Sequence, residues 1–321
     1  MKKIAVLADY LEPSHHALID STAARCGFAV DYYPDCRVPA ELAGTYEVVH
    51  GMPKPGDLKA FTGMKWFCGS FAGVDAYLDD ALYPSPEVML SNSSGAYGVT
   101  IAEHLIMVTL MLLRHAPAYL HHADAHRWGP VMPMRSIIGS TITVLGTGDI
   151  GTEFARRAKA IGAKAIRGVR RTKKAADPAF DGVFTHEELD SLLPDTDILV
   201  MALPSTADTV GILSRDRIAL LPETAYVINV GRGTAIDQPA LVEALNAGKL
   251  AGAALDVFEK EPIPAGDPVW DAKNLLITPH ISGQMSLGYT RDKNVALFCE
   301  DLENYAAGRP LKRYVDRKIG Y

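Results

Sequence analysis

The residues with the clearest chemical meaning form a glycine-rich turn near the middle of the chain. An apolar segment, 141–145, runs directly into Gly146-Thr-Gly148-Asp-Ile-Gly151, and a helix is expected to follow. In the pattern Gly-x-Gly-x-x-Gly, the first glycine makes a tight bend, the second admits a pyrophosphate and the third packs a helix on a strand. The helix N-terminus then offers N–H groups and partial positive charge to the phosphates. This segment therefore predicts dinucleotide binding.

The end of the next strand indicates which dinucleotide is expected. An NAD site carries Asp or Glu about 20 residues after the turn, where it holds the ribose 2′-hydroxyl. The window 165–174 has no acidic residue. Its basic residues are Arg167, Arg170, Arg171, Lys173 and Lys174. This charge favours the 2′-phosphate of NADP, with Arg170 as the main anchor. A solvated basic loop is the competing interpretation, and NAD is the alternative cofactor.

Three further strand ends carry side chains suited to hydride transfer to a carbonyl. That chemistry needs a cation for the substrate carboxylate, an acid for the developing alkoxide and a group that orients the acid. Arg232, Glu261 and His280 each follow a predicted strand, in that order along the chain. Taken singly, Arg232 could be an ordinary strand-end arginine and His280 a satisfied loop histidine. Together with Glu261 they form a candidate catalytic constellation.

With these motifs, the chain resembles the D-isomer-specific 2-hydroxyacid dehydrogenases, in particular the NADP-preferring branch similar to glyoxylate/hydroxypyruvate reductases. The resemblance covers nearly the whole chain. It rests on four motifs in the family's order, which are 144–151, 229–233, 256–262 and 278–283. The stretch 58–75 also looks like the family's substrate loop. Four ordered motifs are far more specific than any one of them.

The resemblance implies a reversible, NAD(P)H-dependent reduction of a small 2-keto acid to the D-2-hydroxy acid. Arg232 would bind the substrate carboxylate and polarise the carbonyl. His280 would be the general acid in reduction and the base in oxidation, with Glu261 on its other ring nitrogen. The backbone at Ala72 and Gly73 would also meet the substrate carboxylate. The identity of the keto acid stays open, since it depends on side chains such as Tyr10, Phe71 and Tyr97 that are expected to face the ligand.

The resemblance also implies a set of cofactor contacts. Residues after the strand 197–202 would line the adenosine and the nicotinamide ribose, and Asp256 would lie near the nicotinamide carboxamide. The full set is Gly146, Gly148, Asp149, Ile150, Gly151, Arg170, Arg171, Ala202, Leu203, Pro204, Val230, Gly231, Asp256 and Gly283.

Two alternating series of strands and helices must position these residues. Strands separated by helix-length segments predict parallel sheets. The strands are expected at 4–8, 28–33, 47–50, 64–68, 140–145, 163–169, 197–202, 225–230, 251–257 and 275–278. The helices include 14–26, a long helix 100–127 that Pro117 should kink or divide, and a last helix 289–307.

The predicted fold is α/β, with two doubly wound parallel-sheet domains. A Rossmann cofactor domain, 98–284, is expected to be inserted in a discontinuous, flavodoxin-like substrate domain, 1–97 and 285–321. In the resembled family the region of the long helix builds a homodimer, whereas a buried core would equally explain its apolar face. A dinucleotide-sensing, corepressor-like binding protein on the same fold is the alternative function, and another hydride-transfer enzyme is a third.

Composition excludes several other classes. The chain has 321 residues, 48% of them hydrophobic, and a formal net charge of −6, which argues against disorder and against a nucleic-acid partner. The apolar stretch 105–113 is too short for a bilayer and the N-terminus lacks a signal-peptide core, so no membrane association and a cytoplasmic location are expected. Four separated cysteines predict reduced thiols. The pair His122 and His126 lacks a nearby Glu that could act as a base, so no metal site is predicted.

Overall fold

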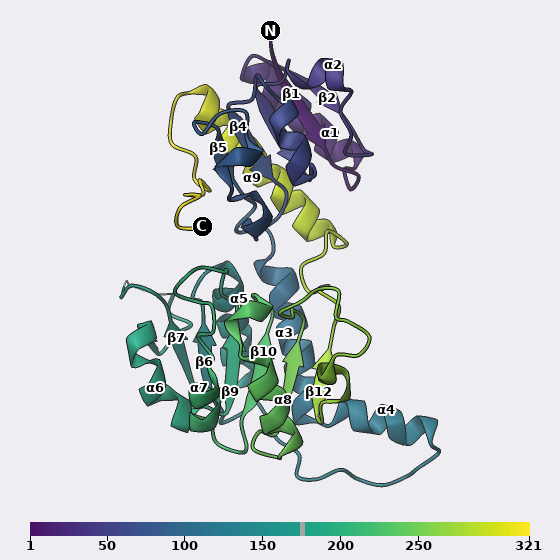
Figure 1. Cartoon of the computed structure of the whole chain (residues 1–321), viewed down its shortest axis with the longest axis vertical. Helices are drawn as coiled ribbons and strands as arrows, with labels where there is room; N and C mark the ends of the chain where they lie inside the picture. The colour runs from purple at the N-terminus through teal and green to yellow at the C-terminus, as the bar shows by residue number, and fades with distance from the viewer. Residues whose placement is uncertain (174–176) are drawn as a thin grey trace. The chain divides into compact units, whose positions relative to one another are not determined.

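The computed structural model describes residues 1–173 and 177–321, which form two compact units (Figure 1). Unit 1 comprises 1–97 and 285–321, and unit 2 comprises 98–284. Each unit is built on its own parallel sheet, five-stranded in unit 1 and seven-stranded in unit 2. The alternation in the sequence therefore predicted the α/β class correctly, with two parallel-sheet domains.

The sheet of unit 1 has the order β2-β1-β3-β4-β5. Its central strands are buried on both faces, as parallel strands covered by helices and loops should be. Ile4 and Val6 lie in one core cluster, and Ala5 and Leu7 lie in another on the opposite face. The strands are β1 (Lys2–Leu7), β2 (Phe28–Tyr32), β3 (Val48–Gly51), β4 (Trp66–Gly69) and β5 (Met89–Ser91).

Two helices from opposite ends of the chain, α1 (Pro13–Arg25) and α9 (Gly288–Ala306), pack together on one face of this sheet. Ile19 of α1 and Phe298 of α9 are fully buried there. The short helix α2 (Ala40–Ala43), loops and part of the C-terminal segment cover the other face. The 3₁₀ helices of unit 1 are Pro55–Ala60, Asp75–Tyr77 and Asp80–Leu82.

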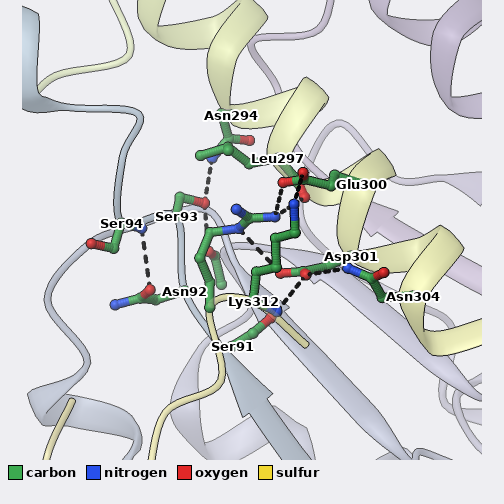
Figure 2. A network of polar contacts seen from close by, with 12 residues as sticks. Ser91, Asn92, Ser93, Ser94, Asn294, Leu297, Glu300, Asp301, Asn304 and Lys312 are labelled. Carbon is green, nitrogen blue, oxygen red and sulfur yellow. Dashed lines mark hydrogen bonds and ion pairs between the residues drawn. The ribbon is translucent and has the colours of Figure 1, made fainter. Parts of the chain in front are cut away.

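The C-terminal segment is fixed to α9 by buried polar contacts (Figure 2). Asp301, which is 1% exposed, accepts from the backbone N–H of Lys312 at 2.8 Å and pairs with Arg313 at 3.1 Å. Val315 then donates its N–H to the carbonyl of Leu90 on the edge strand. Residues 285–321 are therefore an integral part of the core of unit 1.

Unit 2 has the strand order β12-β11-β10-β9-β6-β7-β8. The chain starts in the middle of the sheet at β6, builds outward to β8, and then returns to continue from β9 on the other side. The carboxyl ends of β6 and β9 therefore flank a topological switch point, where open α/β sheets bind ligands. The strands are β6 (Thr141–Leu145), β7 (Ala165–Val169), β8 (Gly182–Phe184), β9 (Ile198–Met201), β10 (Tyr226–Asn229), β11 (Gly252–Leu255) and β12 (Leu275–Ile277).

Helices cover both faces of this sheet. α3 (Gly98–Leu113) and α5 (Asp149–Ile161) pack against each other and against the central strands. The other face belongs to the largest apolar core, to which α6 (Leu189–Leu192), α7 (Arg215–Leu220) and α8 (Gln238–Asn246) contribute. The 3₁₀ helices of unit 2 are His186–Glu188, Leu193–Asp195, Gly233–Ala235 and Pro268–Asp271.

The predicted long helix is divided in two. α3 ends at Leu113, His115 has a left-handed φ of 55°, and α4 (Ala116–Asp124) begins immediately after it at an angle of 65°. Pro117 occupies the second position of α4, where its missing N–H costs nothing. Among the described helices, none alone has the length and apolarity to cross a membrane, although α3 and α4 meet those criteria as a bent pair.

Candidate active site

The glycine turn of unit 2 has the geometry that its sequence requires. Gly146 has a φ of 102° and donates its N–H to the carbonyl of Val169 at 2.9 Å. A Cβ on Gly151 would lie 1.9 Å from the carbonyl oxygen of Gly146. The first glycine is needed for its backbone conformation and the third for the close approach of α5 to the turn.

The second glycine borders open space. Gly148 is the N-cap of α5, and a Cβ built on it would meet nothing within 4 Å. Asp149 and Ile150 are the first residues of the helix, whose first turn carries N–H groups that α5 cannot satisfy internally. These donors and the helix dipole suit a pyrophosphate, so the residues present fit a dinucleotide.

The basic window divides into groups with different partners. Arg167 reaches the carbonyl of Leu192 at 3.5 Å, and Lys173 pairs with Glu188 at 2.8 Å. Lys174 lies outside the described residues. Arg170 directly follows β7, and its N–H donates to the carbonyl of Phe184. Arg171 is exposed beside it. The N–H of Gly146 donates to the carbonyl of Val169, the residue before Arg170. Arg170 and the glycine turn therefore lie at the same edge of the sheet.

The loops after β9 and β10 lie close to the glycine turn 146–151 and to each other. A Cβ on Gly146 would lie 2.6 Å from the carbonyl oxygen of Ala202, and one on Gly231 would lie 2.6 Å from the backbone of Leu203. Ala202 and Val230 also continue the ladder, donating to Leu145 and Met201 respectively. The predicted contacts at 202–204 and 230–231 therefore sit at the carboxyl edge beside the glycine turn.

Arg232 is carried by a turn that a buried amide holds. Asn229, the last residue of β10, is fully buried. Its Oδ1 accepts from the N–H of Gly231 at 3.0 Å, and its Nδ2 donates to the carbonyl of Arg232 at 2.9 Å. The half-buried guanidinium donates to the carbonyl of Gly231 at 2.7 Å. Sequence reasoning quoted Asn229 within its motif but assigned it no role.

His280 and Glu261 form a direct pair. Nδ1 of His280 lies 2.6 Å from Oε2 of Glu261, and the other carboxylate oxygen accepts from the N–H of Phe258 at 2.8 Å. The His280 side chain is 53% exposed. Nε2 has no hydrogen-bond partner within the described part of the chain. The pair thus presents one ring nitrogen outward while the carboxylate holds the other.

Asp256 anchors the loop that bears His280. The carboxylate is 2% exposed and accepts from the Thr278 hydroxyl at 2.6 Å and from the N–H groups of Ile281 and Ser282 at 3.0 Å each. Burial would raise the pKa of Asp256, but the bonds from Ser282, Thr278 and the backbone outweigh it and lower the pKa. These bonds hold the loop although His280 has a left-handed φ of 52°.

In unit 1, the loop 69–73 after β4 has the carbonyls of residues 69–72 bound, whereas in the described part of the chain the N–H groups of residues 71–73 are not. Segment 92–97 supplies all four donors, which are Ser93 Oγ to Gly69 (2.9 Å), Tyr97 Oη to Ser70 (2.5 Å), Ser93 N to Phe71 (2.9 Å) and Asn92 Nδ2 to Ala72 (2.7 Å). Among the described residues, the N–H groups of Phe71, Ala72 and Gly73 find no acceptor. Such a loop suits a carboxylate.

One expectation about this loop needs correction. Tyr10 and Tyr97 were expected to face the ligand, but their hydroxyls bond Ser70 and Tyr97 is 6% exposed. Tyr97 therefore supports the loop from the core instead of facing a ligand, and the Tyr10 hydroxyl supports the loop as well. Burial raises the pKa of both phenols, so both stay protonated and can donate.

The comparisons with known proteins agree with this geometry. Residues 106–282 match the model of the family described as D-isomer specific 2-hydroxyacid dehydrogenase, NAD binding domain. The chain is also 31% identical over 257 residues to glyoxylate/hydroxypyruvate reductase A of Klebsiella pneumoniae (strain 342), covering 78% of this chain and 80% of that protein. The chain belongs to the D-isomer specific 2-hydroxyacid dehydrogenase family.

Solved structures of the family extend the likeness over the whole chain. A D-isomer specific 2-hydroxyacid dehydrogenase family protein from Aeromonas salmonicida has a TM-score of 0.83 at 30% identity, covering 98% of this chain and 99% of that one. An NADPH-dependent glyoxylate/hydroxypyruvate reductase from Sinorhizobium meliloti, solved with NADP and sulfate, has a TM-score of 0.82 at 26% identity, covering 100% of each chain. The protein is an NAD(P)-dependent oxidoreductase, as the motifs predicted.

Proposed function

We propose that the protein reduces a small 2-keto acid, of the size of glyoxylate or hydroxypyruvate, to the D-2-hydroxy acid with NADPH. The observation that carries this proposal is the pairing of His280 with Glu261 at 2.6 Å on the same sheet edge that bears Arg232 and the glycine turn. The names of the relatives support the same substrate class and cofactor. They give no support to a dinucleotide-sensing corepressor.

The proposed mechanism assigns one task to each side chain. Arg232 binds the substrate carboxylate, and Ala72 and Gly73 contribute backbone N–H groups to the same carboxylate. NADPH, when bound, supplies the hydride to the carbonyl carbon. Nε2 of His280 donates a proton to the carbonyl oxygen, and Glu261 stabilises the protonated ring through Nδ1. In oxidation the same nitrogen takes the proton back.

The cofactor would be held by unit 2 through the contacts that the motifs predicted. The phosphates would lie against Gly148 and the N-terminus of α5, and the 2′-phosphate against Arg170 and Arg171. Asp256 has both oxygens occupied by the loop 278–282, so its main contribution in this proposal is to hold His280. A contact of Asp256 or Gly283 with the nicotinamide stays a prediction.

The function is tested by measuring the oxidation of NADPH and NADH with glyoxylate, hydroxypyruvate and phenylpyruvate. Turnover of one of the two small acids, with formation of the D-hydroxy acid on chiral analysis, is the expected result. Absence of turnover on all three acids with both cofactors would contradict an enzymatic role and favour a dinucleotide sensor.

The cofactor preference provides a separate prediction. Wild-type protein should have a higher kcat/KM with NADPH than with NADH. Arg170→Ala should lower kcat/KM for NADPH by roughly tenfold to a hundredfold, the effect of losing a hydrogen bond to a charged group, and leave that for NADH nearly unchanged. Lys173→Ala is the matched control, because Lys173 pairs with Glu188. A wild-type preference for NADH would contradict the assignment.

A homodimer is proposed on the evidence of α4 and the segment that follows it. Large apolar side chains are exposed there: Leu120, Trp128, Met132 and Ile138. In Figure 1, α4 stands clear of the sheet of unit 2. Exposed apolar surface gathered on one extension marks an interaction surface, and the family resemblance assigns the neighbouring helix to a dimer. The cytoplasm is the proposed location, in keeping with four free cysteines.

The dimer is tested by light scattering after size-exclusion chromatography. The wild-type protein should have about twice the 34.7 kDa mass of one chain. Trp128→Ser combined with Met132→Ser should shift it toward the monomer, because both side chains would be buried in the interface. Trp270→Ser, at a second tryptophan of unit 2 that is 50% exposed, should leave the mass unchanged. A monomeric wild-type protein would contradict the proposal.

A further inference from the structure

The loop 69–73 of unit 1 is supported from behind by a buried amide on α9. Asn294 is fully buried, and its Nδ2 donates to Ser93 Oγ at 2.6 Å. Figure 2 shows Asn294 reaching from α9 toward Ser93. On its other side, Oδ1 lies 2.7 Å from the hydroxyl of Tyr10, which in turn lies 2.8 Å from Ser70 Oγ. The Asn294 amide therefore contacts Ser93 and Tyr10, the two side chains that bond the loop at Gly69 and Ser70.

The direction of each hydrogen bond in this network can be deduced. The Ser93 hydroxyl uses its one proton on the carbonyl of Gly69, so Ser93 Oγ can only accept from Asn294. This fixes Oδ1 of Asn294 toward Tyr10, whose phenol proton must then go to Oδ1. The Ser70 hydroxyl is left to donate to Tyr10. Each hydroxyl proton is used once, and the buried amide has a partner on both sides.

Only a neutral side chain with a donor and an acceptor satisfies this position. A carboxylate would offer Ser93 a second acceptor and compete with the Gly69 carbonyl for its proton. An apolar side chain would remove the donor to Ser93 Oγ and the acceptor of the Tyr10 proton in a buried site, so both hydroxyls would have to rearrange. In either case the carbonyl of Gly69 and the hydroxyl of Ser70 would lose support, and with them the orientation of the peptide groups that follow.

We infer that Asn294 is a positioning residue for the substrate. Through Ser93 and Tyr10 it holds the peptide groups at 69–73 so that the N–H groups of Phe71, Ala72 and Gly73 converge on the substrate carboxylate. This inference rests on the proposed function, in which that loop binds a keto acid. Because the carboxylate is held equally in the ground state and the transition state, the effect falls on KM more than on kcat.

The test compares Asn294→Leu and Ser93→Ala with wild type in glyoxylate reduction. Each variant should raise KM for glyoxylate at least tenfold and raise Ki for oxalate, an unreactive dicarboxylate probe, in parallel. The kcat should stay within about threefold and KM for NADPH within about twofold. The double variant should be no worse than the poorer single variant, because both changes break the same chain of hydrogen bonds.

Asn304→Leu is the matched control, since Asn304 is a buried amide of the same helix that bonds Arg309 instead of Ser93. It should leave KM for glyoxylate unchanged. An unchanged KM in a folded Asn294→Leu or Ser93→Ala variant, with folding checked by thermal unfolding, would overturn the inference, as would an equal rise in the control. If Asn294→Leu does not fold, Ser93→Ala decides alone. A wild-type protein that reduces no keto acid would refute the proposed function before any variant is compared.

Discussion

Replacing His280 by Ala should lower kcat for glyoxylate reduction by roughly 10²–10⁴-fold, the range that a positioned general acid contributes. The variant loses the only proton donor that the proposed mechanism places at the carbonyl oxygen. NADPH binding should stay within about twofold of wild type, because the phosphate-binding turn at Gly148 is formed by a different strand end. Stopped-flow absorbance gives the rate of the chemical step, and quenching of protein fluorescence gives the NADPH affinity.

Two comparisons separate an acid role from a structural one. Glu261→Gln keeps a side chain of the same shape beside Nδ1 but removes the negative charge that stabilises the protonated ring. The kcat of this variant for glyoxylate reduction should therefore fall, while its affinity for NADPH stays within about twofold of wild type. His16→Ala, on α1 of unit 1, is the control for loss of a histidine. Full turnover by His280→Ala would rule out the acid role.

Arg232→Ala should lower kcat/KM for glyoxylate by roughly 10²–10³-fold, or about 3–4 kcal/mol of transition-state stabilisation. Nη1 of the guanidinium donates to the Gly231 carbonyl, and Asn229 fixes the turn that carries the residue. It is therefore preorganised to meet a carboxylate and a developing negative charge. Both KM and kcat should change, because the carboxylate is present throughout the reaction while charge on the carbonyl oxygen develops only in the transition state.

The geometry of the charge should matter as well as its sign. Arg232→Lys keeps a cation but loses the planar fork that binds a carboxylate at two points, so its kcat/KM should lie between those of Arg232→Ala and wild type. Arg215→Ala is a suitable control, since Arg215 forms an exposed ion pair with Glu243 in the same unit. Initial rates over a range of glyoxylate concentrations at saturating NADPH are sufficient. A kcat/KM near wild type for Arg232→Ala would refute the assignment.

Local patterns in the sequence predicted the sheet edge of unit 2 well. Gly146 and Gly151 need a backbone conformation or a close approach that other residues cannot provide, and such needs are visible in the sequence itself. The central strands are long enough for an apolar run to be clear. By contrast, the edge strands β5 and β8 were not predicted: each has only three residues and, unlike the equally short β12, neither consists wholly of large apolar residues.

The support of the site was harder to predict. Asn294 is separated by some 200 residues from Ser93, and nothing in the local pattern around either residue indicates the bond between them. Tyr10 and Tyr97 look like ligand-facing aromatics in the sequence, although in the structure their hydroxyls bond Ser70. Asp256 matched a family motif, but its hydrogen bonds to the loop 278–282 come from the Thr278 hydroxyl and two backbone N–H groups that only the folded chain brings together. Long-range polar contacts of this kind leave no periodic signal.

The placement of α9 determines the order in which the chain can fold as it leaves the ribosome. Unit 2 is complete once residue 284 has emerged, whereas unit 1 still lacks Val295, Phe298 and Leu302 of its own core. At 5–20 residues per second, synthesis of residues 98–284, which separate the two parts of unit 1, takes roughly 10–40 s. Throughout that time the face of the first sheet that α9 will cover stays open to water. Newly made chains therefore keep the apolar surface that is made first exposed until α9 has been synthesised.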